Sequence, residues 1–422
     1  MKSERLMGVV GTGSMGAGIA EAAATAGFVV EALDTTAEAV GQAYALIARR
    51  LDGRVSAGKL TAAARAEILS RLRVAECQDC LKDAECIIEA VSEEIDLKRR
   101  TLAGLDAVAS PRTLLATCTS GLSIGELGEG LSQAGRFLGM RFYSPAAIVE
   151  VVELVQGPAT SDQALVDARA VCAKLGKTAV KVEDSPGFIG DRVETPYYLA
   201  ALGLLDTGEA DIRSIDAAVR EVGGFKLGPF EALDAAGVDN SLHAVQTLHA
   251  GFGGAGRFRP NAIQEKLVAG GHVGIRTGRG FYHYQNGEST PAYECPLKDV
   301  SGWAPSPALA EFAEALEAPA DRAAWIFGRV FAAVLNEAAL VADTIALPRD
   351  VNLTMEHGFH YPEGPLALAD RIGLDVVQRL LAECHQETGG DECYAPNPML
   401  DRLVAEGHLG EKTARGFLYH AL

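Results

Sequence analysis

Short apolar runs alternate with longer helix-forming runs from the start of this chain to Ser185. Buried strands of a parallel sheet read as short, nearly continuous apolar segments, whereas longer runs rich in Ala, Glu and Arg favour helices. We therefore expect strands at 6–10, 28–33, 87–91, 113–116, 136–143, 149–155 and 178–182, and helices at 17–26, 37–72 and 96–108. This alternation predicts a doubly wound α/β sheet.

After Ser185 the pattern becomes almost wholly helical, and it repeats. The segment Gly228–Asp239 returns as Gly364–Asp375, at a constant offset in residue number (364 − 228 = 136). The segment Arg279–Phe281 returns as Arg415–Phe417 at the same offset (415 − 279 = 136). One offset held over separate matches indicates a duplicated unit. The fold class is therefore α/β followed by two all-helical C-terminal repeats.

The pattern divides the chain into four parts. We expect an α/β domain at 1–185, helical copies at 186–284 and 322–422, and a linker rich in Pro and Ala at 285–321. Two similar helical units in one chain predict an internal pseudo-dimer, in which each copy buries a face that a shorter chain would bury against a partner. The sequence leaves open whether the protein is a monomer with this internal pair or a homodimer.

Composition narrows the classes of partner. The chain has 422 residues, 48% of them hydrophobic and 22% charged, which are values of a globular protein with about two to three domains. A formal charge of −18 argues against nucleic acid and anionic membranes as partners. We expect no signal peptide, no apolar run approaching the ~20 residues of a membrane helix, and a cytoplasmic location.

The eight cysteines are scattered along the chain. Cys77 and Cys80 have the spacing of metal ligands, but no second Cys pair or His pair completes a tetrahedral set. Reduced thiols in a cytoplasmic protein are therefore the preferred interpretation, and we expect no metal site.

The chain opens with a strand, a glycine-rich turn, a helix and a second strand that ends in an acid. Gly11, Gly13 and Gly16 form a G-x-G-x-x-G motif in the context that dinucleotide binding requires. Gly11 allows the turn, Gly13 lets the backbone approach a pyrophosphate, and Gly16 lets helix and strand pack closely. Asp34 suits a ribose 2′-hydroxyl and would repel a 2′-phosphate, so we expect a Rossmann-type fold that binds NAD.

At this point the chain resembles the L-3-hydroxyacyl-CoA dehydrogenases, particularly the long bacterial form with a duplicated C-terminal domain. The motifs that carry the resemblance are Gly11-x-Gly13-x-Met15-Gly16-x-Gly18-Ile19-Ala20, Ile88-Glu89-Ala90-Val91-x-Glu93, Thr119-Ser120-x-Leu122-Ser123-Ile124, Gly139-Met140-x-Phe142, Val152-Glu153, Ser185-Pro186-Gly187-Phe188-Ile189 and Gly228-Pro229. The resemblance implies oxidation of a 3-hydroxyacyl-CoA by NAD, in a cleft between the α/β and helical domains.

The resemblance also assigns roles to individual residues. It implies that Ser120 positions the substrate oxygen and that Glu153 orients the catalytic base. Glu93 and Lys98 match positions that contact the nicotinamide side of NAD. Ser14 and Met15, inside the glycine-rich turn, join Gly11, Gly13, Gly16 and Asp34 as candidate cofactor-binding residues.

Two positions depart from the family pattern where chemistry is expected. Arg141 occupies the position of the catalytic His, and Asp191 occupies the position of an Asn that holds the substrate oxygen. A general base must be neutral part of the time near the working pH. Guanidinium stays charged, with a pKa above ~12, so Arg141 cannot take the proton of an alcohol.

Four interpretations remain open at Arg141. Tyr143 or Asp191 acts as a substitute base, or Arg141 recognises a carboxylate on an altered substrate. Alternatively, Arg141 and Glu153 form a buried ion pair in a catalytically silent protein that binds NAD or acyl-CoA, or another base serves a hydroxy acid without CoA. Structural roles compete for the same residues: core packing for Tyr143 and the first turn of a helix for Asp191.

Overall fold

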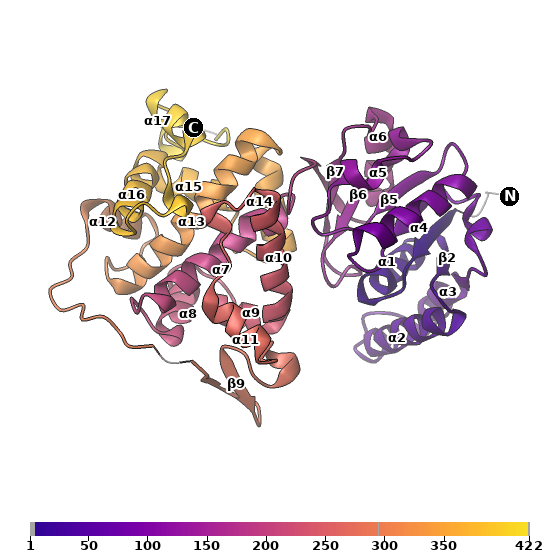
Figure 1. The fold of residues 1–422 in the computed structure, drawn as a ribbon, viewed down its shortest axis with the longest axis horizontal. Coiled ribbons are helices and arrows are strands. Elements are labelled where there is room, and N and C mark those ends of the chain that lie inside the picture. The colour runs from indigo at the N-terminus through magenta and orange to yellow at the C-terminus, as the bar shows by residue number, and fades with distance from the viewer. Residues whose placement is uncertain (1–4, 294, 421–422) are drawn as a thin grey trace. The chain divides into compact units, whose positions relative to one another are not determined.

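The computed structural model describes residues 5–293 and 295–420 (Figure 1). The chain divides into two compact units between Phe188 and Ile189. The first unit combines strands with helices, and the second is largely helical.

An eight-stranded sheet forms the centre of the first unit. Its strands are β1 (Leu6–Val10), β2 (Val29–Leu33), β3 (Leu72–Val74), β4 (Cys86–Glu89), β5 (Leu114–Thr117), β6 (Phe137–Phe142), β7 (Val151–Gln156) and β8 (Thr178–Glu183). They lie in the order β3-β2-β1-β4-β5-β6-β7-β8, and neighbours are parallel except β6 with β7. The predicted doubly wound sheet is confirmed. Its strand order reverses between β1 and β4, the place where such sheets bind ligands.

Helices cover this sheet because its central strands are apolar on both faces. They are α1 (Ser14–Thr25), α2 (Ala37–Ser56), α3 (Ala62–Ser70), α4 (Ile95–Val108), α5 (Ile124–Gly128) and α6 (Asp162–Lys174). Every residue of β4, β5 and β6 is buried. Helix α1 starts directly after the glycine-rich turn and ends before Gly27, whose φ of 92° suits glycine.

The prediction of one helical region over 37–72 was wrong in its second half. Helix α2 ends at Ser56, and Gly58 follows with a φ of 69°, which few other residues adopt. Helix α3 then begins because the Thr61 side chain accepts a hydrogen bond from the Ala64 N–H at 3.1 Å. Leu72 starts strand β3.

The second unit contains the two helical copies. The first comprises α7 (Gly190–Asp206), α8 (Ile212–Glu221), α9 (Pro229–Ala236), α10 (Val238–Gly251) and α11 (Ala262–Ala269); the second comprises α13 (Arg322–Thr344), α14 (Pro348–Gly358), α15 (Pro365–Ile372), α16 (Leu374–Glu387) and α17 (Pro398–Ala405). The starts of α9 and α15 differ by the offset seen in the sequence (365 − 229 = 136), as do those of α10 and α16 (374 − 238 = 136). Helices α7 and α13 pack against each other, which joins the copies (Figure 1).

The C-terminal region is almost wholly helical, as predicted, with one short exception. Strands β9 (Tyr282–Gln285) and β10 (Glu288–Pro291) pair as an antiparallel hairpin at the end of the first copy. The predicted linker also contains helix α12 (Pro307–Ala315), which the Ser306 side chain caps.

Helix α13 is long and apolar enough, by length and composition, to cross a membrane. The expectation that no apolar run approaches that length was therefore wrong by this measure. However, 89% of its most apolar window is buried inside the second unit. This burial identifies α13 as a core helix, because an apolar helix needs a protein or lipid environment and here protein supplies it.

Candidate functional site

A cavity of about 480 Å³ lies where the glycine-rich turn leaves β1. Five predicted cofactor residues line it: Gly11, Gly13, Ser14, Met15 and Asp34. Gly16, Glu93 and Lys98 do not belong to its described lining. The cavity lies at the carboxyl ends of β1 and β2, where a parallel sheet presents ligands to the following helix N-terminus.

The three glycines of the motif do different physical work. Gly11 has a φ of 90°, and a Cβ there would lie 2.6 Å from the Ala90 carbonyl oxygen. A Cβ on Gly16 would lie 1.9 Å from the Gly11 carbonyl oxygen, so Gly16 serves close packing. A Cβ on Gly13 would meet no atom within 4 Å, which leaves bare backbone facing open space. A dinucleotide pyrophosphate fits that arrangement.

Asp34 is held in place by the turn that it faces. Its Oδ2 accepts hydrogen bonds from the Thr12 N–H at 2.6 Å and the Thr12 hydroxyl at 2.7 Å, and its Oδ1 accepts from the Thr35 N–H at 2.7 Å. Burial raises the pKa of Asp34, but these hydrogen bonds outweigh burial and hold the pKa below its usual value. The ionised carboxylate suits ribose hydroxyls and repels a 2′-phosphate, so the residues present fit NAD.

Lys98 is fully buried and acts as an anchor for two carboxylates. Its Nζ lies 2.9 Å from Glu89 Oε1 and 3.4 Å from Glu93 Oε2. Glu89 also accepts a hydrogen bond from the Thr117 hydroxyl at 2.6 Å. Lys98 therefore reaches a ligand only through its partners. The sequence motif contains Glu89 but gave it no role, although an acid at the end of the apolar strand β4 signals a buried partner.

Glu93 brings Ser120 into this network. Burial raises the pKa of Glu93, but Lys98 and hydrogen bonds from Thr119 and Ser120 outweigh burial and lower it below the usual value. The Ser120 N–H and hydroxyl donate to Glu93 Oε1 at 2.8 and 3.2 Å. Lys98, assigned to the cofactor, and Ser120, assigned to the substrate, thus both contact the Glu93 carboxylate.

Arg141, Tyr143 and Glu153 form a buried cluster at the end of β6 and the facing part of β7, here called the Arg141 cluster. The Arg141 guanidinium lies 3.8 Å from Glu153 Oε1 and 4.8 Å from the centre of the Tyr143 ring. It also donates to the Gly187 carbonyl at 3.3 Å. The Tyr143 hydroxyl donates to Glu153 Oε1. The side-chain exposures are 8% for Arg141 and 0% for Glu153, so this charge pair is shielded from water.

The strand predicted at 136–143 was wrong at its end, because β6 stops at Phe142 and Tyr143 follows it. Arg141 and Tyr143 nevertheless contact each other and the same carboxylate. Because Tyr143 follows the strand, its hydroxyl turns to Glu153 on the antiparallel neighbour β7, across the register pair Arg141–Glu153.

Asp191 lies in the second unit, in the first turn of α7. One turn later, Glu194 is buried, with one carboxylate oxygen that has no hydrogen-bond partner among the described residues. Burial raises the pKa of Glu194 to about 8, although the neighbouring Tyr198 and Tyr361 hydroxyls oppose the shift, and the Asp191 charge adds to it. Sequence reasoning missed Glu194. Its signal was an acid in the second turn of a helix whose remaining residues are largely apolar.

The described residues contain no group of three or more His, Cys, Asp or Glu side chains able to hold a metal ion. Cys77 and Cys80 are free thiols, the first exposed and the second half-buried. The chemistry of the first unit therefore rests on the dinucleotide cavity and on the Arg141 cluster.

Family models place the chain among known enzymes. Residues 6–185 match the NAD-binding domain of 3-hydroxyacyl-CoA dehydrogenase, and residues 187–284 and 325–420 both match its C-terminal domain. The family model thus matches the two helical copies separately.

Individual relatives agree with the family models. The chain is 30% identical to 3-hydroxyadipyl-CoA dehydrogenase of Escherichia coli, over 95% of this chain and 97% of the relative. It is 36% identical to 3-hydroxybutyryl-CoA dehydrogenase of Bradyrhizobium diazoefficiens, over 68% and 97% of the two chains.

Solved structures show the same likeness. A crystal structure of 3-hydroxybutyryl-CoA dehydrogenase from Escherichia coli superposes with a TM-score of 0.84 at 29% identity, covering 96% of this chain and 99% of the other. The (S)-3-hydroxybutyryl-CoA dehydrogenase from Ralstonia eutropha superposes with a TM-score of 0.65 at 35% identity, covering 67% of this chain and 100% of the other. The chain belongs to the 3-hydroxyacyl-CoA dehydrogenase family, a family of NAD-dependent oxidoreductases.

Proposed function

We propose that this protein oxidises a 3-hydroxyacyl-CoA to the 3-ketoacyl-CoA with NAD, and that it moves the substrate proton without a histidine. Family membership and the substrates named for the relatives support the reaction. The observation that carries the altered proton step is the buried contact of the Tyr143 hydroxyl with Glu153 beside Arg141.

The turn from Gly11 to Met15 and the Asp34 carboxylate would hold the dinucleotide. When bound, NAD accepts the hydride from the substrate carbon. Glu93, fixed by Lys98, carries a full negative charge near the Ser120 hydroxyl, which keeps that hydroxyl oriented. These residues bind the dinucleotide and orient the Ser120 hydroxyl. The proton of the substrate hydroxyl needs a separate acceptor.

The Tyr143–Glu153 pair supplies that acceptor. The substrate O–H bond breaks as a new O–H bond forms on Tyr143, while the proton that Tyr143 held passes to Glu153 Oε1. The reverse transfer serves reduction. Arg141 faces the Tyr143 ring at 4.8 Å, and a fixed cation favours the tyrosinate character that develops during transfer. Burial of all three side chains strengthens this effect, because water does not screen it.

The test is a kinetic comparison of Tyr143→Phe with the unchanged protein, using NADH and acetoacetyl-CoA and following nicotinamide absorbance. We expect kcat to fall about 10²–10⁴-fold, the usual contribution of a positioned proton donor, with KM changed less. Tyr44→Phe is the matched control. Tyr44 lies on helix α2, and its hydroxyl donates to the Arg73 carbonyl at 2.7 Å and not to the Arg141 cluster. Full activity of Tyr143→Phe would exclude the phenol as proton carrier.

A second candidate is supported by the 3.8 Å approach of Arg141 to Glu153, which is also the geometry of a purely structural ion pair. In that case the protein binds NAD or acyl-CoA without turnover. Absence of turnover in the unchanged protein, with activity gained in Arg141→His combined with Asp191→Asn, would favour this silent binder. Turnover in the unchanged protein would exclude it.

We also propose that the two helical copies make the chain self-sufficient as a monomer. The packing of α7 on α13 supports this, because it joins equivalent helices of the two copies. Light scattering of the purified protein tests it: a mass near 44.3 kDa is expected, and a mass twice as large would exclude it.

A further inference from the structure

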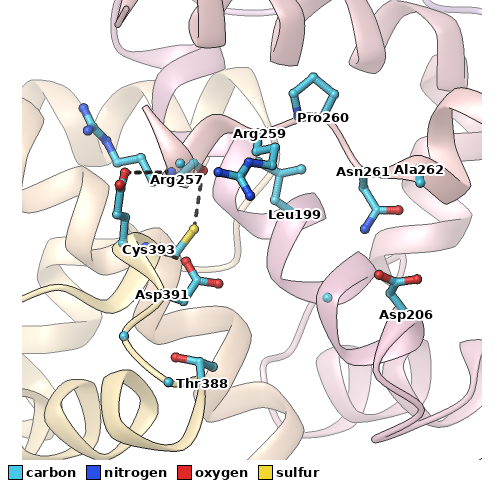
Figure 2. A pocket seen from close by; sticks show the side chains of 15 residues that line it. Leu199, Asp206, Arg257, Arg259, Pro260, Asn261, Ala262, Thr388, Asp391 and Cys393 are labelled. Atoms are coloured by element: carbon cyan, nitrogen blue, oxygen red, sulfur yellow. Dashed lines mark hydrogen bonds between the residues drawn. The ribbon is translucent and has the colours of Figure 1, made fainter. Parts of the chain in front are cut away.

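The two helical copies meet where α7 packs on α13, and one part of their junction is open to water. A cavity of about 510 Å³ lies there, lined by Gly203 of α7, by residues 256–262 of the first copy and by residues 388–393 of the second (Figure 2). Arg259 and Asp391, which Figure 2 labels on this lining, are exposed. Water solvates exposed charges, so the charges of this open part need no protein partner.

Another part of the junction is closed and holds two buried polar atoms without partners. One is Oε2 of Glu194, in the second turn of α7, and the other is the hydroxyl of Tyr361, in the loop after α14 of the second copy. Glu194 is 7% exposed and Tyr361 is 8% exposed, and neither atom has a hydrogen-bond partner among the described residues. Buried polar groups are nearly always hydrogen-bonded, so this pair requires an explanation.

Glu194 and Tyr361 are neighbours, and aromatic packing holds the tyrosine. Burial raises the pKa of Glu194 and the Tyr361 hydroxyl opposes this rise, while burial and the Glu194 charge raise the pKa of Tyr361 well above its usual value. The centre of the Tyr361 ring lies 4.8 Å from that of Phe225 and 5.9 Å from that of Tyr197. A side chain of the second copy is thus held among residues of the first, with its hydroxyl near the Glu194 carboxyl.

The duplication gives an internal reference for this pair. At the constant offset, Glu194 corresponds to Val330 (330 − 194 = 136) and Tyr361 corresponds to Phe225 (361 − 225 = 136). A left-handed residue precedes both aromatic side chains, with a φ of 72° in the first copy and 59° in the second. The shared fold therefore accepts apolar side chains at both positions and does not require the carboxyl or the hydroxyl.

Glu194 lies in surroundings that do not neutralise a carboxylate. Burial raises its pKa to about 8, the Tyr198 and Tyr361 hydroxyls oppose the rise, and the Asp191 charge adds to it. No cation among the described residues acts on this carboxyl, and Glu194 belongs to no ion pair there.

The neighbouring elements supply an apolar wall and charges that already have partners. Tyr197 and Tyr361 share a small cavity whose lining from α13 is apolar: Phe327, Val330, Phe331 and Val334. Charged residues of the surrounding segments pair elsewhere: Glu363 with Arg371, Glu337 with Arg192 and Arg257, Asp350 with Arg349, and Glu231 with Arg220. A charge on Glu194 is therefore unpaired in a poorly hydrated place, which costs free energy.

We propose that Glu194 and Tyr361 form a lock between the helical copies, which the proton on Glu194 closes and the loss of that proton loosens. In the closed state the neutral carboxyl donates its O–H to the Tyr361 hydroxyl oxygen, and both unpartnered atoms gain a partner. On loosening, the Glu194 O–H bond breaks and the proton passes to water. The carboxylate becomes hydrated when the start of α7 and the loop at 359–363 move apart.

The start of α7 is suited to such a movement. Pro196 lies inside the helix and has no N–H to donate to the Arg192 carbonyl, which weakens the helix at this point. The equivalent residue of α13 is Ala332, so α13 lacks this weak point. Asp191, which the family resemblance assigns to the substrate oxygen, lies in the same first turns. One consequence rests on the proposed function: Glu194 is then a positioning residue for Asp191, and loosening the lock weakens substrate binding.

The direction of the pH effect follows from the two states of Glu194. A hydrated carboxyl releases its proton near pH 4.5, whereas the buried one holds its proton to about pH 8. The lock is therefore complete below pH 4.5, and it weakens by up to about tenfold per pH unit as the pH rises to about 8. Above that pH the carboxyl is ionised in both states, and the effect levels off.

The test is amide hydrogen exchange of the full-length protein between about pH 6 and pH 9, followed in peptides that cover 190–198 and 359–363. Protection is the intrinsic exchange rate at each pH divided by the measured rate. We expect the protection of both segments to fall as the pH rises to about 8 and to change little above it. Since exchange needs no substrate, this measurement does not depend on the dehydrogenase activity.

Three variants assign the effect. Glu194→Gln keeps the shape of the side chain and cannot ionise, so its protection should not vary with pH. In Tyr361→Phe the fall should continue above about pH 8, because the hydroxyl that stabilises the carboxylate is removed. Glu265→Gln changes an exposed glutamate of α11 and is the matched control, which should behave as the unchanged protein does.

Each outcome decides the proposal. Protection that does not vary with pH in the unchanged protein, or that falls equally in Glu194→Gln, overturns the lock. A fall that ends at the same pH in Tyr361→Phe overturns the role of Tyr361. The KM for acetoacetyl-CoA is expected to rise between about pH 6 and pH 8 in the unchanged protein and to rise less in Glu194→Gln; equal profiles overturn the positioning of Asp191. Absence of turnover would contradict the proposed function, and the exchange measurement would still decide the lock.

Discussion

The two helical copies share a backbone plan and differ in where they place charge. Asp234 and its counterpart Asp370 are both buried, and each accepts two backbone N–H groups, from Phe281 and Tyr282 in one copy and from Phe417 and Leu418 in the other. Around α7, however, Asp191 and Glu194 correspond to Phe327 and Val330 in α13. Side chains that accept backbone hydrogen bonds occur in both copies. Positions where the copies differ are not required by the shared fold and can serve a function specific to one copy.

The largest effect is expected at the junction of the copies, where Glu337 joins two arginines. Its Oε1 contacts Arg192, its Oε2 lies 2.9 Å from Arg257 Nε, and its side chain is 2% exposed. We expect Glu337→Ala to lower the free energy of unfolding by about 3–5 kcal/mol, because it leaves the buried Arg192 unpaired. Chemical denaturation measures this.

Arg402→Ala is the control for that measurement, since Arg402 pairs with Asp343 on the surface. We expect little change from it. Equal stability of Glu337→Ala and the unchanged protein would show that the pair does not hold the copies together.

The next prediction compares Asp234 with Asp370, the carboxylates that both copies share. We expect Asp234→Ala and Asp370→Ala each to cost about 3 kcal/mol of unfolding free energy, because each strands two backbone N–H groups that lie in the core. Similar losses are expected, and denaturant titration of the two variants measures them. A large loss in one copy and none in the other would contradict the shared plan.

A pH effect separates Asp216 from its counterpart Asn352. Both accept a backbone N–H, at 2.9 and 3.0 Å. Burial raises the pKa of Asp216 to about 7, although hydrogen bonds from Tyr282 and the Phe230 N–H oppose the shift. The unfolded chain releases this proton near pH 3.8, so stability is lost as pH rises from there to about 7.

We therefore expect Asp216→Asn to flatten the dependence of stability on pH across that interval. Asn352→Asp is the matched reverse exchange and should add a loss of the same sign. Denaturation midpoints at several pH values measure both, and unchanged slopes in both variants would refute the assignment.

The smallest expected effect on stability concerns Gly203 in α7. Gly203→Ala should raise the free energy of unfolding by about 0.5–1 kcal/mol, since the new methyl group meets open space and alanine favours a helix. Gly237→Ala should do the opposite, because Gly237 has a φ of 100°. Melting curves distinguish the two signs; a destabilised Gly203→Ala would mean that the cavity floor is tighter than the structure indicates.

Much of the fold was predictable because its signals are local. The apolar runs predicted the main strands of the sheet, and the constant offset between the repeats recurs in helices α9, α10, α15 and α16. The break between α2 and α3 was missed, because Gly58 and Thr61 act through backbone geometry that an Ala-rich pattern conceals. The short hairpin of β9 with β10 was missed because these two strands contain few apolar residues.

Residue identity at spaced positions was enough to predict the family and the NAD cofactor, which the comparisons confirm. From the same motifs, the replacement of a titrating base by Arg141 stays a prediction. A guanidinium is charged wherever it lies, so no coordinates were needed for that prediction. Folding was needed to turn the Tyr143 hydroxyl to Glu153, to bury Lys98 between two carboxylates, and to open a charged cavity where the copies meet. Each of these depends on how separate strands, helices and loops pack against one another, and residue type alone does not specify that packing.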